Sequence, residues 1–266
     1  IILKLQHLYV GYINLKNDKT GTAYTGTAST DYIIADLSGT TDTVIIKSSG
    51  ANVVDTLIGI ENITGTSGND TIFGDSGANT LISGAGNDIL EGGAGDDYLD
   101  GGADIDTVFY NPATSGVNVN LGTTALQNVG CGQRNDTLIG IENVIGSGFA
   151  DTFKGNNSVS NTFNGGMNLS TQVENLNDGN DTVDYSTLTG VTDKIIVDLS
   201  NTISANVQVT VAGVAQGADT LINIENVIGG AGNDTFTGNN NNNILTGGAG
   251  DDYFYVKDAA ISGEND

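Results

Sequence analysis

The stretch that decides the fold runs from Gly65 to Phe109 and reads GTSGNDTIF GDSGANTLI SGAGNDILE GGAGDDYLD GGADIDTVF. It consists of five nine-residue units without a gap. The sixth position of every unit is Asp or Asn, and the eighth is a large aliphatic residue. A second block, from Gly229 to Tyr255, reads GGAGNDTFT GNNNNNILT GGAGDDYFY. A period of this kind indicates a repeat architecture in which each unit packs against its neighbours along a stack.

Each unit predicts a turn followed by a short strand. The first six positions are rich in Gly, which tolerates positive φ and close approach of backbones. The last three positions form a short strand whose middle side chain points inward. Two units complete one coil of 18 residues, so turns 18 residues apart stack on the same side. We predict an all-β fold, a parallel β-roll or β-solenoid.

The charge of the chain indicates a cation partner. Acidic residues number 32 against 8 basic ones, for a formal charge of −24. This balance excludes a nucleic-acid partner, because affinity for phosphates comes from Lys and Arg. Short acidic side chains beside Gly and Asn suit a hard cation with oxygen ligands, and Ca²⁺ takes such ligands at about 2.3–2.6 Å. We expect Ca²⁺ between stacked turns, held by paired position-six side chains: Asp70 with Asp88, Asp88 with Asp106, Asn79 with Asp97, and Asp234 with Asp252.

The units resemble the RTX (repeats-in-toxin, haemolysin-type) calcium-binding nonapeptide, GGxGxDxUx, in which U is a large apolar residue. Eight units in two blocks carry the resemblance. It implies a fold stapled by calcium, with roughly six to ten Ca²⁺ ions per chain and oxygen ligands throughout. The position-six ligands would be Asp70, Asn79, Asp88, Asp97, Asp106, Asp151, Asp181, Asp234, Asn243 and Asp252. The resemblance also implies ligands from turn carbonyls, at Gly65, Ser67, Gly74, Ser76, Ser83, Gly84, Ala85, Gly86, Gly93, Gly95, Gly102, Asp104, Gly229, Ala231, Gly248 and Gly250.

A longer period divides the chain into about three tandem modules. DTLIGIENI begins at Asp55, DTLIGIENV at Asp136 and DTLINIENV at Asp219, and each leads into nonapeptides. The copy after Asp136 is degenerate and carries an insertion, and we predict that Asp151 and Asp181 form a further pair across it. We expect the connectors to continue the solenoid with longer, less regular loops. The predicted division is 1–54 (N-terminal strands and first connector), 55–110 (first roll), 111–135 (connector), 136–185 (second roll), 186–218 (connector) and 219–266 (third roll, continuing beyond the chain end).

No catalytic centre is expected. His7 is the single histidine, which excludes HExxH zinc chemistry and a Ser-His-Asp set. Residues 1–15 read as a strand pair rather than a membrane span, so we expect no transmembrane segment. We further expect the chain to be disordered at cytosolic calcium and to fold at the higher calcium outside the cell, because metal binding and folding are coupled in a thin, highly charged fold.

Three functions are compatible with these features. The first is a structural segment of a surface adhesin, surface-layer protein or filament, with self-association through apolar strands such as Leu3–Leu15 or contacts with the cell surface or extracellular matrix. The second is the secretion and folding module of an exported enzyme or toxin, released by type I secretion, whose active part lies elsewhere. The third is a solenoid face that binds carbohydrate or another surface ligand. All three place the chain outside the cell or at its surface.

Overall fold

In the computed structural model, the described residues are 31–39, 42–48, 51–57, 59–130, 134–156, 159–166, 180–200, 205–211 and 214–255. Within these ranges the secondary structure is entirely β-strand, turn and bend. None of them contains a helix that could cross a membrane. The chain forms two compact units, one from Ile1–Pro112 with Thr123–Asn143, the other from Ala113–Gly122 with Val144–Asp266. The predicted segment 1–15, with His7, lies outside the described residues, as does Cys131.

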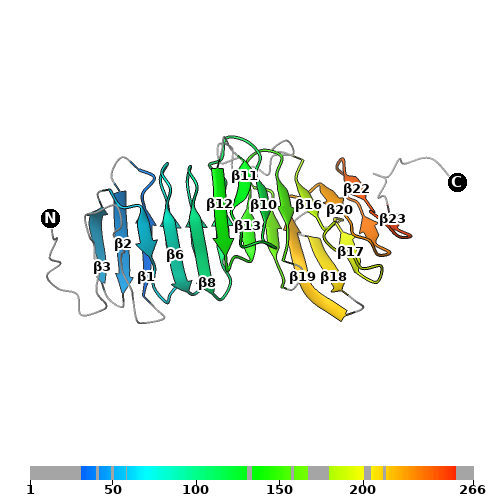
Figure 1. Cartoon of the computed structure of the whole chain (residues 1–266), viewed down its shortest axis with the longest axis horizontal. Helices are drawn as coiled ribbons and strands as arrows, with labels where there is room; N and C mark the ends of the chain where they lie inside the picture. Colours follow the sequence, from blue (N-terminus) through cyan, green and yellow to red (C-terminus); the bar gives the residue numbers. More distant parts are fainter. Residues whose placement is uncertain are drawn as a thin grey trace. The chain divides into compact units, whose positions relative to one another are not determined.

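The first unit contains two sheets. One has the strand order β9-β7-β5-β1-β2-β3 and the other β11-β12-β8-β6-β4. Their bounds are β1 (Tyr32–Asp36), β2 (Asp42–Ser48), β3 (Ala51–Leu57), β4 (Asn62–Thr64), β5 (Thr71–Phe73), β6 (Thr80–Ala85), β7 (Ile89–Glu91), β8 (Tyr98–Ala103), β9 (Thr107–Phe109), β11 (Gln127–Gly130) and β12 (Arg134–Ile139). The nonapeptide strands alternate between the two sheets, and Figure 1 shows β6 beside β8 in one of them.

The register in this unit confirms the predicted 18-residue coil. Thr71 of β5 lies opposite Ile89 of β7, and Ile89 lies opposite Thr107 of β9, in parallel pairing. In the other sheet Thr80 of β6 lies opposite Tyr98 of β8, also in parallel. The eighth-position side chains point inward as predicted and are fully buried: Ile72, Leu81, Leu90, Leu99 and Val108. These five residues form the core of the roll, which one apolar side chain per strand supplies.

The second unit repeats this arrangement with aromatic core residues, although at its end the eighth-position side chains depart from the prediction, because Leu245 is only half-buried and Phe254 is 47% exposed. Its sheets have the orders β13-β15-β19-β18-β17-β21-β23 and β10-β14-β16-β20-β22. The ring of Phe153 stacks on that of Phe163, with centroids 5.7 Å apart, and both side chains are fully buried. The bounds are β10 (Asn118–Asn120), β13 (Asn143–Ile145, of which the last two residues belong to this unit), β14 (Thr152–Lys154), β15 (Thr162–Asn164), β16 (Thr182–Asp184), β17 (Lys194–Asp198), β18 (Ala205–Val211), β19 (Val214–Ile222), β20 (Asn226–Ile228), β21 (Thr235–Thr237), β22 (Ile244–Thr246) and β23 (Tyr253–Tyr255).

The connectors, for which we expected longer, less regular loops, contain antiparallel strands. In the first unit β1, β2 and β3 form an antiparallel meander, seen side by side in Figure 1, and β11 pairs with β12 in the same way. In the second unit β17, β18 and β19 form a corresponding meander. Each meander begins on a strand that also pairs in parallel with a nonapeptide strand, β1 with β5 and β17 with β21. The coil is therefore continuous in the core, and the extra strands extend one of its sheets.

The DTLIxIEN segments are coils with one short turn. Two successive inward side chains, Leu221 on β19 and Val227 on β20, are six positions apart, whereas those of successive nonapeptides are nine apart, as in Leu81 and Leu90. The same spacing separates Leu57 from Ile63, and these residues are also buried. The segments thus belong to the roll, but their turn is too short to hold a complete GGxGxD loop.

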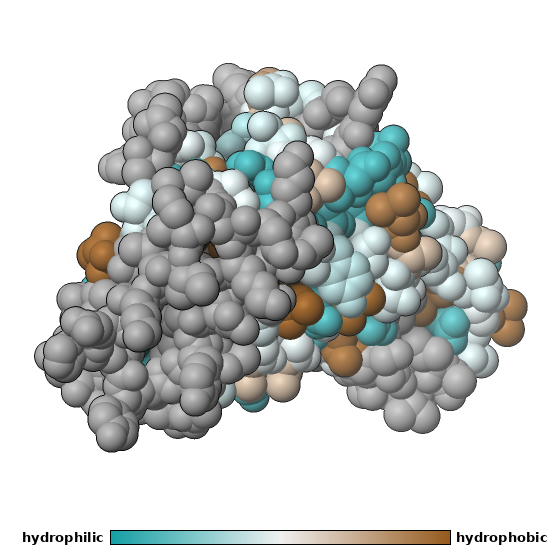
Figure 2. Space-filling model, turned by 60° about the vertical axis from the view of Figure 1, so that its left-hand side comes forward, coloured by the Kyte–Doolittle hydropathy of each residue, from teal (hydrophilic) through white to brown (hydrophobic). Residues whose placement is uncertain are grey.

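Many apolar side chains at the surface lie singly, but on the last described strands, β22 and β23, Ile244, Tyr253, Phe254 and Tyr255 are all exposed. On the face in Figure 2, brown residues lie singly or in small groups among teal and pale ones, in the part of that face that the structure describes. Exposed examples in the first unit are Val54, Ile105 and Leu126. Single exposed apolar residues are normal on protein surfaces and do not by themselves indicate an interface.

Candidate calcium sites

The position-six side chains of the first unit form two ladders, one on each side of the roll. On one side the backbone N–H of Asp70 donates to Oδ1 of Asp88 at 2.7 Å, and the N–H of Asp88 donates to Oδ1 of Asp106 at 2.8 Å. On the other side the N–H of Asn79 donates to Oδ1 of Asp97 at 2.8 Å. All five side chains are buried. Carboxylates of successive coils are therefore held in register by the backbone of the coil before them.

The second unit contains equivalent pairs. The N–H of Asp151 donates to Oδ1 of Asp181 at 2.7 Å, although 30 residues separate them in the sequence. The N–H of Asp234 donates to Oδ1 of Asp252 at 2.9 Å. The structure thus brings together all five pairs named from the sequence. Their role as calcium ligands stays a prediction.

Asn243 has different surroundings. Its Oδ1 accepts from the N–H of Asn239 at 2.9 Å, and its Nδ2 donates to the carbonyl of Glu225 at 2.9 Å. The position 18 residues further on lies outside the described residues. Among the residues that the structure describes, no position-six partner from a following turn lies beside Asn243.

The turns of neighbouring coils stack so closely that glycine Cα atoms lie against carbonyl oxygens one coil away. Gly84 has φ +116° and Gly102 has φ +93°, in the region that favours glycine. A Cβ at Gly102 would collide with the carbonyl oxygen of Gly84, and a Cβ at Gly84 with that of Thr66. The predicted carbonyl positions face their equivalents one coil away in the same manner: Gly65 faces Ser83, Gly74 faces Gly92, Gly86 faces Gly68, Gly95 faces Gly77, Gly229 faces Gly247, Gly248 faces Gly230 and Gly250 faces Gly232.

The carboxylates fit a cation because some of their oxygens have no donor. Oδ2 of Asp88 and Oδ2 of Asp106 are buried and accept no hydrogen bond from the described residues. Oδ2 of Asp70, at the start of the ladder, instead accepts from the N–H of Thr66 in its own turn. Leaving a charged group buried without a partner costs several kcal/mol or shifts its pKa. Ca²⁺ between the turns would remove that cost, and Asp88 and Asp106 would then be among the residues that hold it.

The composition of the sites favours calcium over transition metals. Among the described residues, no three His, Cys, Asp or Glu side chains converge on one point. A cation here would be held by about two carboxylates, with carbonyl oxygens completing the shell, which suits the six to eight oxygens that Ca²⁺ takes. Zinc prefers His and Cys ligands, and no such side chain lies among the described residues.

The pKa values of these carboxyls reflect the same burial. Burial raises the pKa of Asp70 to about 6 from an ordinary value of 3.8, against hydrogen bonds from Thr66 and Ile33 that lower it. Burial, together with the neighbouring charges of Asp88, Glu142 and Asp104, raises the pKa of Asp106 to about 7. Negative charge is therefore unfavourable in these turns unless a cation is bound.

Two buried tyrosines mark positions that sequence reasoning missed. Asp136 and Asp219, the first residues of two DTLIxIEN segments, lie in the ladders: Asp97 N–H donates to Oδ1 of Asp136 at 3.2 Å, and Asn161 N–H to Oδ1 of Asp219 at 2.8 Å. The hydroxyl of Tyr110 donates to Oδ2 of Asp136, and that of Tyr185 to Oδ2 of Asp219, each at 2.8 Å. In both pairs the tyrosine hydroxyl thus donates to Oδ2, the oxygen that has no donor in Asp88. The sequence signal that could have indicated these contacts was the DTVxY motif, which recurs upstream of both segments.

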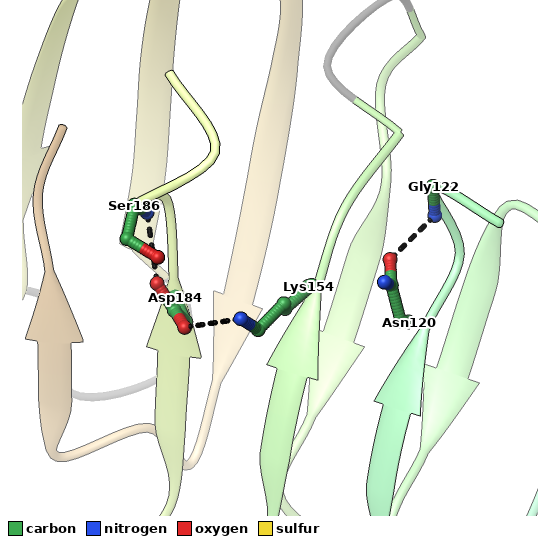
Figure 3. Close-up of polar contacts among 5 residues, drawn as sticks. All are labelled: Asn120, Gly122, Lys154, Asp184 and Ser186. Carbon is green, nitrogen blue, oxygen red and sulfur yellow. Dashed lines mark hydrogen bonds and ion pairs between the residues drawn. The ribbon is translucent and has the colours of Figure 1, made fainter. Parts of the chain in front are cut away.

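Outside the ladders, an ion pair joins two neighbouring strands of the second unit. Figure 3 shows Lys154 of β14 reaching across to Asp184 of β16, with Nζ 2.7 Å from Oδ2. The N–H of Ser186 donates to Oδ1 of the same carboxylate at 2.8 Å, and Asn120 accepts from the N–H of Gly122 in the same way. Burial tends to raise the pKa of Asp184, but the hydrogen bonds and the charge of Lys154 outweigh it and lower the pKa. The ammonium group of Lys154 is therefore the cationic partner of this carboxylate.

Comparison with known families agrees with this geometry. The model of the RTX calcium-binding nonapeptide repeat, which describes four copies, matches residues 55–90, 73–108 and 223–256. No curated protein matches the chain. The chain therefore carries RTX calcium-binding nonapeptide repeats, in two blocks that correspond to the two clean runs of the sequence. It is a calcium-binding repeat protein with a parallel β-roll fold, and proteins with such repeats are typically secreted.

Proposed function

We propose that this chain is a non-catalytic, extracellular structural segment that folds and becomes rigid when calcium binds. The observation that carries the proposal is the ladder of buried carboxylates, in which Asp88 and Asp106 each keep an oxygen without a donor. With a formal charge of −24, the metal-free chain also repels itself. Calcium offsets both the burial of these carboxylates and the repulsion between the negative charges, so the binding free energy contributes directly to folding.

The calcium concentrations on the two sides of a cell membrane make this coupling useful. Extracellular calcium modules bind in the range of about 10⁻⁴–10⁻³ M. Sites of that affinity are empty in the cytosol and filled outside, so the chain folds only after export. Folded, the roll presents parallel strands held in one register, as in β5, β7 and β9. A surface adhesin, surface layer or filament needs a stiff spacer of this type.

Assembly is tested by light scattering and electron microscopy of the whole chain at millimolar calcium, with magnesium at the same ionic strength as the control. The proposal of a self-associating surface or filament protein expects particles that grow as calcium is added and dissolve in chelator. A folded chain that stays monomeric at all calcium concentrations would contradict self-association and favour the module of an exported enzyme or toxin.

A further inference from the structure

Two glutamates outside the nonapeptides occupy ladder positions. The N–H of Asp106 donates to Oε2 of Glu142 at 3.0 Å, and the N–H of Asp181 donates to Oε2 of Glu225 at 3.0 Å. Asp70 makes the same bond to Asp88 within the nonapeptides. Each glutamate therefore takes the place of the next position-six Asp, at the short turn of a DTLIxIEN segment. The longer side chain suits a turn that has lost three residues.

The same short turns also supply a carbonyl. A Cβ at Gly101, the first position of the turn that ends at Asp106, would collide with the carbonyl oxygen of Gly140. A Cβ at Gly165, upstream of Asp181, would collide with that of Asn223. Within the nonapeptide stack, Gly65 meets the carbonyl of Ser83 in this way. The carbonyl oxygen of the short turn therefore lies where the carbonyl oxygen of position one lies in a complete nonapeptide turn.

The backbone of each short turn adopts a conformation that allows this position of the carbonyl. Gly140 has φ +58° and Asn223 has φ +53°, so both adopt the left-handed conformation. Asn is one of the few residues other than Gly that enters this region without large cost. The segments that begin at Asp136 and Asp219 lie in different units, yet each places a carbonyl and a glutamate carboxylate in the same way.

One buried oxygen points to a ligand between these elements. Asp106 is fully buried, and its Oδ2 accepts no hydrogen bond from the described residues. A Cβ at Gly101 would lie 2.5 Å from this oxygen as well as against the carbonyl of Gly140. The oxygens of Asp106 and Gly140 therefore face the same small space, beside the carboxylate of Glu142. A donor-free carboxylate oxygen in a buried space requires a cation or a proton.

We propose that Glu142 and Glu225 each complete a further Ca²⁺ site, formed by one nonapeptide turn and one short DTLIxIEN turn. The first site takes Asp106, Glu142 and the carbonyl of Gly140, and the second takes Asp181, Glu225 and the carbonyl of Asn223. Two carboxylates with carbonyls make an all-oxygen shell that suits Ca²⁺, whereas Mg²⁺ demands near-ideal octahedral geometry and retains water. The inference rests on calcium binding by the nonapeptide turns and not on where the protein works.

The test counts bound calcium per chain by equilibrium dialysis and atomic emission, at a free calcium concentration that just saturates the wild-type chain. Glu142→Gln and Glu225→Gln keep the length and the hydrogen-bond acceptor of the side chain and remove its charge. Each single variant should bind one ion fewer than the wild type, and the double variant two fewer. Glu91→Gln, on β7 of the first unit, removes the same charge away from the short turns and should leave the count unchanged.

Circular dichroism of the same samples shows whether each variant is folded. Because the two sites lie in different units, a variant that fails to fold in one unit leaves the other as an independent test. An unchanged count in folded Glu142→Gln and Glu225→Gln would overturn the inference, because the glutamates would then only accept backbone N–H groups. A wild-type chain that binds no calcium would instead refute the calcium chemistry of the nonapeptide turns themselves.

Discussion

Replacing Asp88 by Asn separates the destabilisation that comes from burying its charge from the stabilisation that comes from its binding of calcium. Asp88 is the middle member of the ladder and is shared by the predicted sites with Asp70 and with Asp106. The Asn amide oxygen can still accept from the N–H of Asp70, so the backbone bond is retained. Burial raises the pKa of Asp88, which means that its charge is unfavourable in the metal-free fold. In chelator, where the wild type is expected to be unfolded, Asp88→Asn should therefore show at least as much β signal as the wild type.

In calcium the sign reverses. A site at a free calcium about 100-fold above its Kd stabilises the fold by about 2.7 kcal/mol. Two sites share Asp88, so weakening both about 100-fold removes up to about 5 kcal/mol of calcium-dependent stability. The assay is urea unfolding at 25 °C, followed by circular dichroism, at calcium just above the folding midpoint and at saturating calcium, with the β signal in chelator recorded alongside. The matched control is Asp96→Asn, an exposed position-five residue whose Oδ1 accepts from Asn135 at 3.0 Å. Equal calcium-dependent stabilisation of Asp88→Asn and Asp96→Asn would refute the reasoning.

Three further predictions concern the turns, the tyrosine and the pH dependence. Gly102→Ala should lower the free energy of unfolding in calcium by about 1–3 kcal/mol, because its φ is +93° and a Cβ meets the carbonyl of Gly84, whereas Gly148→Ala, in open space, should change it little. Tyr185→Phe should cost about 1–3 kcal/mol in urea unfolding at pH 7.5 in saturating calcium, because Asp219 loses its 2.8 Å donor; unchanged stability would show that water replaces the hydroxyl. In chelator the folded fraction, measured by circular dichroism, should fall as the pH rises from 4 to 7, because Asp70, Asp106 and Asp219, with pKa values raised by burial to about 6, about 7 and about 6, bind protons more tightly when folded. Calcium should weaken or reverse this trend, since protons compete with it, and a flat profile in chelator would contradict it.

The nonapeptide coil could be predicted from the sequence because its interactions are local and periodic. A period of nine with an inward residue at position eight fixes both the 18-residue coil and the core, as Ile72, Leu90 and Val108 show. The same period identifies which position-six side chains become neighbours. The Asp151–Asp181 pair could be found despite its insertion, because the strand motif after each Asp, DTF and DTV, was recognisable.

The DTLIxIEN coils could not be placed by period, because their short turn removes three residues and shifts the register. Glu142 therefore follows Asp106 by 36 residues and Glu225 follows Asp181 by 44, and neither spacing is the 18 residues that separate neighbouring coils of the nonapeptide stack. The antiparallel strands β2 and β18 were missed for a related reason. Their partners are set by pairing across the meander, on which the nonapeptide period carries no information.

The most direct test of the account is a calcium titration of the whole chain, followed by circular dichroism, with magnesium titrated in parallel. If buried carboxylates prevent folding until calcium binds, β signal should appear cooperatively near millimolar calcium, and magnesium should fail to replace it. A chain that already shows full β signal in chelator at pH 7.5 would contradict the coupling of folding to calcium.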